Sequence, residues 1–166
     1  RRNIDLTVIL FNNQIYGMTG GQFSPMTPTG DLATTAPYGN IDQNFDLAEL
    51  VEGAGGTFIA RGATFEPRQL KKLYLAALKH KGFSFVESFS QCPVSYGRQN
   101  SSGNAVEMLK NQEENTIDYK KWQQLSDKEK ELKYPLGVLK EIDNPESEYT
   151  ARYQKIIEKV NKEGAL

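Results

Sequence analysis

The sequence predicts an α/β fold in which helices cover both faces of a parallel sheet, giving three layers. Residues 6–11 form a continuous run of large apolar and β-branched residues, which is typical of a strand covered on both faces. Strand-like and helix-like segments alternate from there to residue 89, which indicates right-handed crossovers between parallel strands. The strands end in polar segments, where parallel sheets bind their ligands.

The segment after the first strand predicts a long connection, then a helix and a second strand. Residues 24–44 are rich in Ser, Pro, Thr and Gly, and their prolines exclude long regular elements. Loops of this length inside compact domains are usually functional. A short helix follows over residues 45–53, beginning near Asn44 or Asp46, and residues 57–62 predict the second strand.

A second helix and a third strand complete the alternation. The helix begins near Pro67, and Gly82 is a natural stop for it. Residues 83–89 predict the third strand, which leads directly into Cys92 and should deliver it to the same sheet edge as Asn13. One face of the helix should be buried, because its apolar residues recur at three- and four-residue steps: Leu70, Leu73, Tyr74, Ala77 and Leu78.

We expect one domain over residues 1–166, with a core that carries the ligand loop over 1–100 and a C-terminal extension over 101–166. From residue 96 to the end of the extension, the sequence predicts in order a loop over 96–103, a helix over 105–121, a short charged helix over 125–133, a strand over 136–142 and an amphipathic helix over 149–162.

Composition excludes several classes of partner. The 20 basic and 21 acidic residues are interspersed, so we expect no nucleic-acid footprint and no polybasic membrane patch. No apolar stretch approaches the roughly 18 residues of a transmembrane helix, and we expect a cytoplasmic protein. The single cysteine, Cys92, rules out an intrachain disulfide. Because a strand begins almost directly after Arg1, we expect a fragment that is incomplete at its N-terminus.

The chemistry concentrates in residues 12–22, Asn-Asn-Gln-Ile-Tyr-Gly-Met-Thr-Gly-Gly-Gln. The side-chain oxygen of Asn13 and the backbone carbonyl of Ile15 are hard ligands that suit Mg²⁺. The glycines let backbone N–H groups approach an anion closely. This pattern predicts a metal-diphosphate site, although paired Asn before glycines is also ordinary turn chemistry.

Two further residues have both a functional and a structural interpretation. A lone cysteine such as Cys92 commonly acts as a small buried hydrophobe. His80 lies at a helix end between Lys79 and Lys81, which predicts a solvated surface residue.

Residues 10–22, followed by Ser24-Pro25 and preceded by the segment 1–7, resemble the thiamine-diphosphate site in the β subunits of 2-oxoacid:ferredoxin oxidoreductases. The resemblance implies the diphosphate-binding type of the thiamine-diphosphate-binding fold. It also implies that the Asn13 side chain and the Ile15 carbonyl bind Mg²⁺, and that Tyr16, Gly17, Met18 and Thr19 line the cofactor. Residues 90–93, Ser-Gln-Cys-Pro, resemble the family segment that carries the last of four cysteine ligands to a [4Fe–4S] cluster, which implies that Cys92 binds this cluster.

The chain departs from the family pattern upstream of the paired Asn. The family has a Gly-Asp-Gly signature there, whose Asp is a further Mg²⁺ ligand, and three more cluster cysteines. Neither stands before Asn12 in this sequence. The resemblance therefore implies half of a cofactor site, and we expect the fragment alone to be inactive.

The implied reaction is the coenzyme A-dependent oxidative decarboxylation of a 2-oxoacid, with electrons passing through the cluster to ferredoxin. The implied partners are the α subunit, γ or δ subunits as further candidates, ferredoxin and coenzyme A. Pyruvate-specific relatives have a polar Asn where this chain has Met18, which argues against pyruvate. Some 2-oxoglutarate enzymes have a Lys at the position of Gly20, and its absence tilts the choice toward 2-oxoisovalerate, while 2-oxoglutarate stays open because the α subunit also shapes the pocket. Two alternatives remain: a truncated, non-catalytic assembly module, and a non-redox thiamine-diphosphate decarboxylase in which Cys92 has no role.

Overall fold

The structure is a computed structural model that describes residues 2–163, and within these residues five strands form one sheet in the order β1-β3-β2-β5-β4. The strands β1 (Leu6–Asn12), β3 (Phe83–Phe89) and β2 (Phe58–Ala63) are parallel. The strand β5 (Tyr134–Glu141) runs antiparallel to β2, and the short β4 (Thr116–Asp118) pairs with β5. The three predicted parallel strands are confirmed, and the predicted strand over 136–142 begins two residues earlier.

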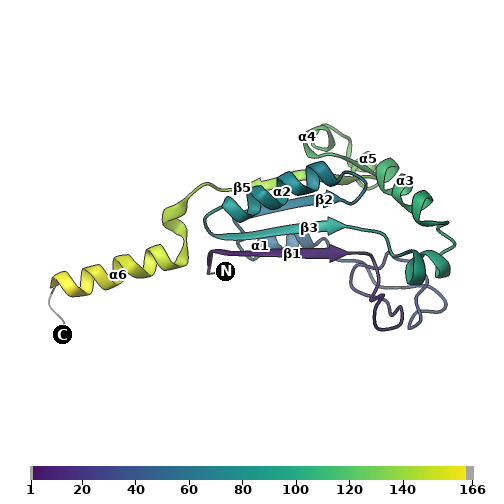
Figure 1. Cartoon of the computed structure of the whole chain (residues 1–166), viewed down its shortest axis with the longest axis horizontal. Helices are drawn as coiled ribbons and strands as arrows, with labels where there is room; N and C mark the ends of the chain where they lie inside the picture. Colours follow the sequence, from purple (N-terminus) through teal and green to yellow (C-terminus); the bar gives the residue numbers. More distant parts are fainter. Residues whose placement is uncertain (1, 164–166) are drawn as a thin grey trace.

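Helices cover both faces of the parallel strands, as predicted (Figure 1). On one face, α2 (Pro67–Lys79) packs Leu73 and Ala77 against a buried cluster that includes Phe58 and Val86. On the other face, α1 (Leu47–Gly53) packs Ala48 against Ile59 and Phe85. Successive residues of β2 and β3 alternate between the two clusters because side chains along a strand point to opposite faces. The core therefore lies on both sides of one short parallel sheet.

Local sequence sets the helix ends. Asp46 is the N-cap of α1, and its carboxylate accepts the backbone N–H groups of Ala48 and Glu49. Pro67 occupies the first turn of α2, where its missing N–H costs nothing. After α2, Gly82 has φ +123°, and a Cβ at this position would lie 2.5 Å from Asn3 Oδ1. Position 82 therefore requires glycine both for its backbone conformation and for space.

His80 is buried, so the prediction of a solvated surface residue is wrong. Only 9% of its surface is exposed, its Nε2 lies 2.9 Å from Thr57 Oγ1, and its ring contacts Phe58 with centroids 5.5 Å apart. The neighbouring Lys79 and Lys81 suggested a solvated helix end. Phe58 begins β2 and Thr57 precedes it, however, and the residue that ends α2 contacts both, which sequence spacing did not reveal.

The strand β1 is an edge strand of the described sheet and one of its two faces is largely uncovered, so the prediction that both its faces are covered is wrong for this chain. It pairs with β3 on one side, and no other strand of residues 2–163 pairs with its opposite side. On one face of β1, Ile9 and Phe11 are exposed, with 68% of Phe11 accessible, whereas Val8 and Leu10 on the other face pack against the cluster that includes Ala48 of α1. A continuous apolar run predicts that a strand is covered but does not identify the element that covers it.

The C-terminal region has shorter elements than predicted. The helix expected over 105–121 ends at residue 115 as α3 (Ala105–Asn115), because β-branched Thr116 and Ile117 pair with β5 as β4. Asp118 then caps α4 (Tyr119–Trp122). The charged helix over 125–133 shortens to α5 (Asp127–Lys130). A π-helix, η1 (Pro93–Gly97), extends into the predicted loop over 96–103, and a 3₁₀ turn, η2 (Pro145–Ser147), precedes the last helix.

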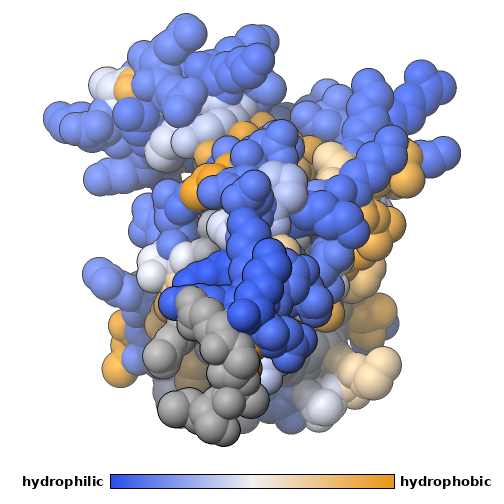
Figure 2. All heavy atoms as spheres, turned by 90° about the vertical axis from the view of Figure 1, so that its left-hand side faces the viewer, coloured by the Kyte–Doolittle hydropathy of each residue, from blue (hydrophilic) through white to orange (hydrophobic). Residues whose placement is uncertain are grey.

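The terminal helix α6 (Tyr149–Glu163) confirms the amphipathic helix predicted over 149–162, but it projects from the sheet rather than packing on it (Figure 1). Its apolar side chains are exposed: Tyr153, Ile156, Ile157 and Val160. Seen from this end, the molecule is mainly hydrophilic, with apolar patches along its margins (Figure 2). Among the residues that the structure describes, no helix has the length and apolar character that a membrane crossing requires.

Candidate functional site

The two adjacent amides at the end of β1 occupy different environments. Asn12 is 7% exposed; its Nδ2 donates to Glu87 Oε1 over 2.6 Å, and its Oδ1 accepts the Gln14 backbone N–H over 3.0 Å. Asn13 is half-buried, lines a cavity, and its side chain makes no hydrogen bond to another residue between 2 and 163. Asn13 therefore offers a free oxygen to a ligand, whereas the oxygen of Asn12 is already used.

The backbone that follows is held in a specific conformation. Gln14 has φ +63°, in the left-handed region, which side chains other than glycine rarely adopt. Its N–H is held by Asn12, and its carbonyl accepts a 2.6 Å hydrogen bond from the hydroxyl of fully buried Thr27. Ile15 is buried, and its carbonyl accepts the Gly17 N–H over 3.1 Å, which leaves one lone pair for a metal.

Residues 13–22, which we call the polar turn, close on themselves beyond this point. The Tyr16 N–H donates to the Gln22 carbonyl and the Gly21 N–H to the Tyr16 carbonyl, each over 2.9 Å. The side chain of Met18 is fully exposed. Within the described chain the backbone N–H groups of Met18 and Thr19 donate to no other residue. Two free donors at an exposed turn suit the binding of an anion such as a phosphate.

Cys92 lies at the same sheet edge as Asn13, as predicted, and it contacts the polar turn. The Ser90 N–H donates to the Asn12 carbonyl over 2.9 Å, which continues the pairing of β1 with β3. A Cβ at Gly17 would lie 3.1 Å from Cys92 Sγ, and Ser95 Oγ donates to the Gly17 carbonyl over 3.3 Å. The absence of a side chain at position 17 thus allows the thiol to approach the turn backbone.

The surroundings of Cys92 favour its thiolate. Burial alone would raise the pKa of this thiol, but backbone N–H groups of Tyr96 and Ser95, at the start of η1, lower its pKa below the ordinary value. The thiolate is the form of cysteine that binds metals. No group of three or more His, Cys, Asp and Glu side chains forms a metal site within residues 2–163. Cys92 is thus a competent single ligand, and its role stays a prediction.

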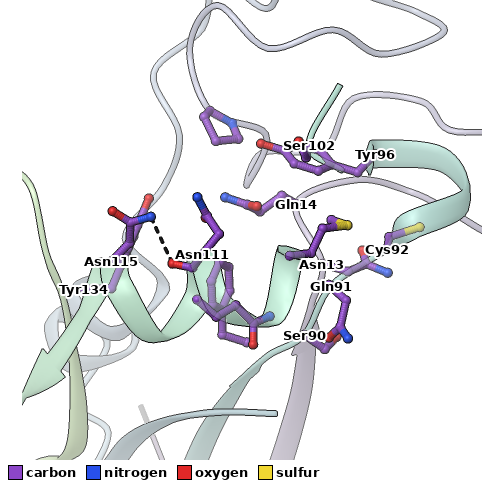
Figure 3. A pocket seen from close by; sticks show the side chains of 14 residues that line it. Asn13, Gln14, Ser90, Gln91, Cys92, Tyr96, Ser102, Asn111, Asn115 and Tyr134 are labelled. Atoms are coloured by element: carbon purple, nitrogen blue, oxygen red, sulfur yellow. Dashed lines mark hydrogen bonds between the residues drawn. The ribbon is translucent and has the colours of Figure 1, made fainter. Parts of the chain in front are cut away.

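A cavity of about 340 Å³ opens beside Asn13 and Cys92. Figure 3 shows Asn13 and Cys92 on one side of it and Asn111 and Asn115 on the other. Tyr96 also lines the cavity, and its hydroxyl donates to Asp31; burial and this hydrogen bond raise the pKa of Tyr96 above the ordinary value. The lining is rich in uncharged amides: Asn13, Gln14, Gln91, Asn111, Gln112 and Asn115. Our sequence reasoning missed the contribution of α3, although its amides recur at three- and four-residue steps.

A buried network of charges lies beneath the polar turn, and the sequence reasoning missed it as well. Arg61 Nε donates to Glu87 Oε2 over 2.7 Å, and the same guanidinium contacts Asp46 over 3.0 Å. Arg61 and Glu87 are 4% and 2% exposed. The sequence signal for this network was a single charged residue inside each of two otherwise uncharged strands.

Comparisons with known proteins identify relatives of the chain. Residues 1–88 match the family model described as thiamine pyrophosphate enzyme, C-terminal TPP binding domain. The chain is 46% identical over 163 residues to the 2-oxoglutarate synthase subunit KorB of Methanocaldococcus jannaschii, covering 98% of this chain and 60% of the relative. It is 39% identical over 94 residues to the 2-oxoacid:ferredoxin oxidoreductase subunit beta of Saccharolobus solfataricus, covering 57% of this chain and 31% of the relative.

A solved structure shares the fold. It is the 2-oxoglutarate:ferredoxin oxidoreductase from Magnetococcus marinus with 2-oxoglutarate, coenzyme A and succinyl-CoA bound; the TM-score is 0.79 at 24% identity, over 97% of this chain and 55% of that one. The similarity confirms the predicted fold of this chain. Among these three relatives, the chain spans at most 60% of the relative's length.

Proposed function

The chain belongs to the thiamine pyrophosphate enzymes, as their C-terminal TPP-binding domain, and from this premise we propose that it is part of the β subunit of a 2-oxoacid:ferredoxin oxidoreductase. The complete enzyme would oxidatively decarboxylate 2-oxoglutarate with coenzyme A as acyl acceptor and ferredoxin as electron acceptor. The names of the similar subunits from archaea and the thiamine pyrophosphate family match support this proposal.

The polar turn fits the diphosphate and metal end of the cofactor. The free side-chain oxygen of Asn13 and the Ile15 carbonyl would bind Mg²⁺, which prefers such hard ligands. The unpaired N–H groups of Met18 and Thr19 would face the diphosphate oxygens. Tyr16 and Gly17 would complete this side of the site. When bound, thiamine diphosphate supplies the electron sink for decarboxylation, and an iron–sulfur cluster accepts the electrons singly.

The contact between Gly17 and Cys92 is the observation that carries the redox part of the proposal. The Cys92 thiolate would bind a [4Fe–4S] cluster beside the turn that holds the cofactor, because Cys92 Sγ lies where a side chain at Gly17 would come within 3.1 Å of it. A cluster needs further cysteines, and these would come from outside the 166 residues, which contain one. A decarboxylase without redox chemistry predicts no role for Cys92.

The substrate we propose is 2-oxoglutarate rather than 2-oxoisovalerate. The similar archaeal subunits are named for 2-oxoglutarate, and this outweighs the absence of a Lys at Gly20. The cavity beside Asn13 is lined by amides whose N–H groups can donate to a carboxylate, which agrees with a dicarboxylic substrate. An α subunit would complete the pocket.

Purification of the complete protein with its co-purifying subunits tests the proposal. Iron, sulfide and thiamine in one complex, with turnover of 2-oxoglutarate that depends on coenzyme A and ferredoxin, are the expected result. Thiamine without iron would instead indicate the non-redox decarboxylase, and neither cofactor would indicate the assembly module. Faster turnover of 2-oxoisovalerate would overturn the substrate assignment alone.

Asn13→Ala in this complete enzyme should weaken the binding of Mg²⁺ and thiamine diphosphate by at least about tenfold, because a metal ligand is lost. Asn111→Ala is the matched control, since it removes an exposed amide from the same cavity without touching the turn. Unchanged cofactor affinity in Asn13→Ala would refute the metal assignment. Cys92→Ser should lower the iron content while thiamine binding persists.

A further inference from the structure

The buried network beneath the polar turn has a fixed direction from donor to acceptor. Arg61 carries only hydrogen-bond donors, and Glu87 as a carboxylate carries only acceptors. Glu87 Oε2 accepts from Arg61 Nε over 2.7 Å, and its other oxygen accepts from Asn12 Nδ2 over 2.6 Å. Asp46 contacts the far side of the guanidinium through both carboxylate oxygens, at 3.0 and 3.1 Å. Each of these hydrogen bonds can therefore run in one direction only.

This direction determines which way the Asn12 amide faces. Its two ends, Nδ2 and Oδ1, are nearly the same shape, so packing alone distinguishes them poorly. The carboxylate of Glu87 can accept only from Nδ2, which leaves Oδ1 to face the polar turn. There, Oδ1 accepts the Gln14 N–H over 3.0 Å. Glu87 thus sets an acceptor at the point where the turn requires one.

The turn depends on that acceptor because Gln14 is held in the left-handed region, with φ +63°. Gln14 separates Asn13 from Ile15, the two residues that would bind Mg²⁺. A change at the Gln14 N–H would rotate the peptide planes on either side of it. The relative placement of the Asn13 side chain and the Ile15 carbonyl would then be lost.

We propose that Glu87, itself held by Arg61 and Asp46, is a positioning residue for the cofactor: it orients Asn12 so that the polar turn presents Asn13 and Ile15 to Mg²⁺. The inference rests on the proposed function, because it concerns the same metal-diphosphate site. Glu87 does not touch the metal or the diphosphate in this scheme. Its effect is transmitted through one side chain, Asn12, and one backbone amide, that of Gln14.

The first test is Glu87→Gln in the complete enzyme. The introduced amide matches the Glu87 carboxylate in shape, but one of its two ends is an NH2 group, which donates. This NH2 group must face another donor, either an N–H of Arg61 or the Nδ2 of Asn12, unless the Asn12 amide turns over. If Asn12 turns over, its Nδ2 faces the Gln14 N–H. We expect the dissociation constant of Mg²⁺-thiamine diphosphate, measured by calorimetry on the cofactor-free enzyme, to rise about 10- to 100-fold. Turnover at saturating cofactor should stay within about threefold, because the lost interaction is one of binding.

The second test is a rescue by the double variant Asn12→Asp with Glu87→Gln. The carboxylate introduced at position 12 accepts from the Gln14 N–H and from the amide introduced at position 87, whose oxygen in turn accepts from Arg61. Every donor again meets an acceptor, and the net charge of the network is unchanged. The double variant should recover cofactor affinity to within about threefold of the wild type. Asn12→Asp alone should not, because two carboxylates would then face each other.

Ser88→Ala is the matched control. Ser88 follows Glu87 on β3, is fully buried, and forms a 2.7 Å hydrogen bond with Tyr74 of α2 on the opposite face of the sheet. Its loss should lower stability but leave cofactor affinity unchanged. If Ser88→Ala weakens binding as much as Glu87→Gln does, the effect is general destabilisation and the inference is wrong.

The remaining outcomes are separable. Normal affinity in a folded Glu87→Gln, with affinity lost in Asn13→Ala, overturns the inference and leaves the proposed function standing. Normal affinity in Asn13→Ala refutes the metal assignment and the inference with it, while the proposed reaction is tested separately by the cofactor content and turnover of the purified complex. If Glu87→Gln does not fold, the double variant decides. A double variant that folds and binds the cofactor supports the inference, whereas one that also fails to fold shows that the network serves only to stabilise the fold, and the inference is overturned.

Discussion

The buried network and the polar turn lie directly against each other, and both are built from polar residues. In the network, Asn12, Arg61 and Glu87 are almost fully buried, and each has its hydrogen-bond partners inside the chain. In the turn, the Asn13 side chain and the Met18 N–H have none within the described residues. The difference separates residues that satisfy one another from residues that are free to satisfy a ligand.

The largest effect on stability should come from the buried network. Arg61→Met fills similar space but leaves Glu87 buried without its cation, which should lower the free energy of unfolding by about 3–5 kcal/mol. Urea denaturation measures this change. Arg68→Met, at an exposed position of α2, is the control and should be nearly neutral. A loss below about 1 kcal/mol for Arg61→Met would show that the network does not differ energetically from the surface.

A smaller effect, dependent on pH, should come from the rim of the network. Burial would raise the pKa of the Asp46 carboxyl, but Arg61 and the N–H of Glu49 hold its pKa below the ordinary 3.8. Because the folded pKa is the lower one, Asp46 contributes stability above the unfolded value, and this is lost as pH falls through the folded pKa. Its side chain is 41% exposed, so we expect about 1 kcal/mol or less.

Asp46→Asn checks that expectation by urea titration between about pH 3 and about pH 7. The variant should be less stable near neutral pH and should show a shallower loss of stability in acid than the wild type. Asp143→Asn, at an exposed position, provides the comparison. Parallel pH profiles for wild type and Asp46→Asn would contradict the assignment.

The smallest effect on stability should come from the turn itself. Met18 is fully exposed, so Met18→Ala should change the free energy of unfolding of the chain by less than about 0.5 kcal/mol. The same variant should still reduce turnover of the complete enzyme, where we propose that Met18 lines the cofactor. A destabilisation above about 1 kcal/mol, with turnover intact, would show that this turn residue stabilises the chain rather than binding the cofactor.

The sequence predicted the parallel strands and α2 because continuous apolar runs and helical periodicity are local signals. It also placed Asn13 and Cys92 at one edge, because parallel strands end together. It could not predict the buried network, since the pairing of Arg61 with Glu87 depends on the register of β2 and β3, where they are direct neighbours. His80 was misjudged for the same reason: its partner Thr57 is close in space and distant in sequence.

The buried network also determines how much of this chain is needed to transfer the polar turn to another protein scaffold. Asn12 and Glu87 are 75 positions apart, so a peptide that contains only Asn12 and the polar turn lacks the carboxylate that orients Asn12. It also lacks Thr27, which holds the Gln14 carbonyl. A protein engineer who grafts this turn onto another scaffold must therefore transplant three strands and a buried ion pair with it.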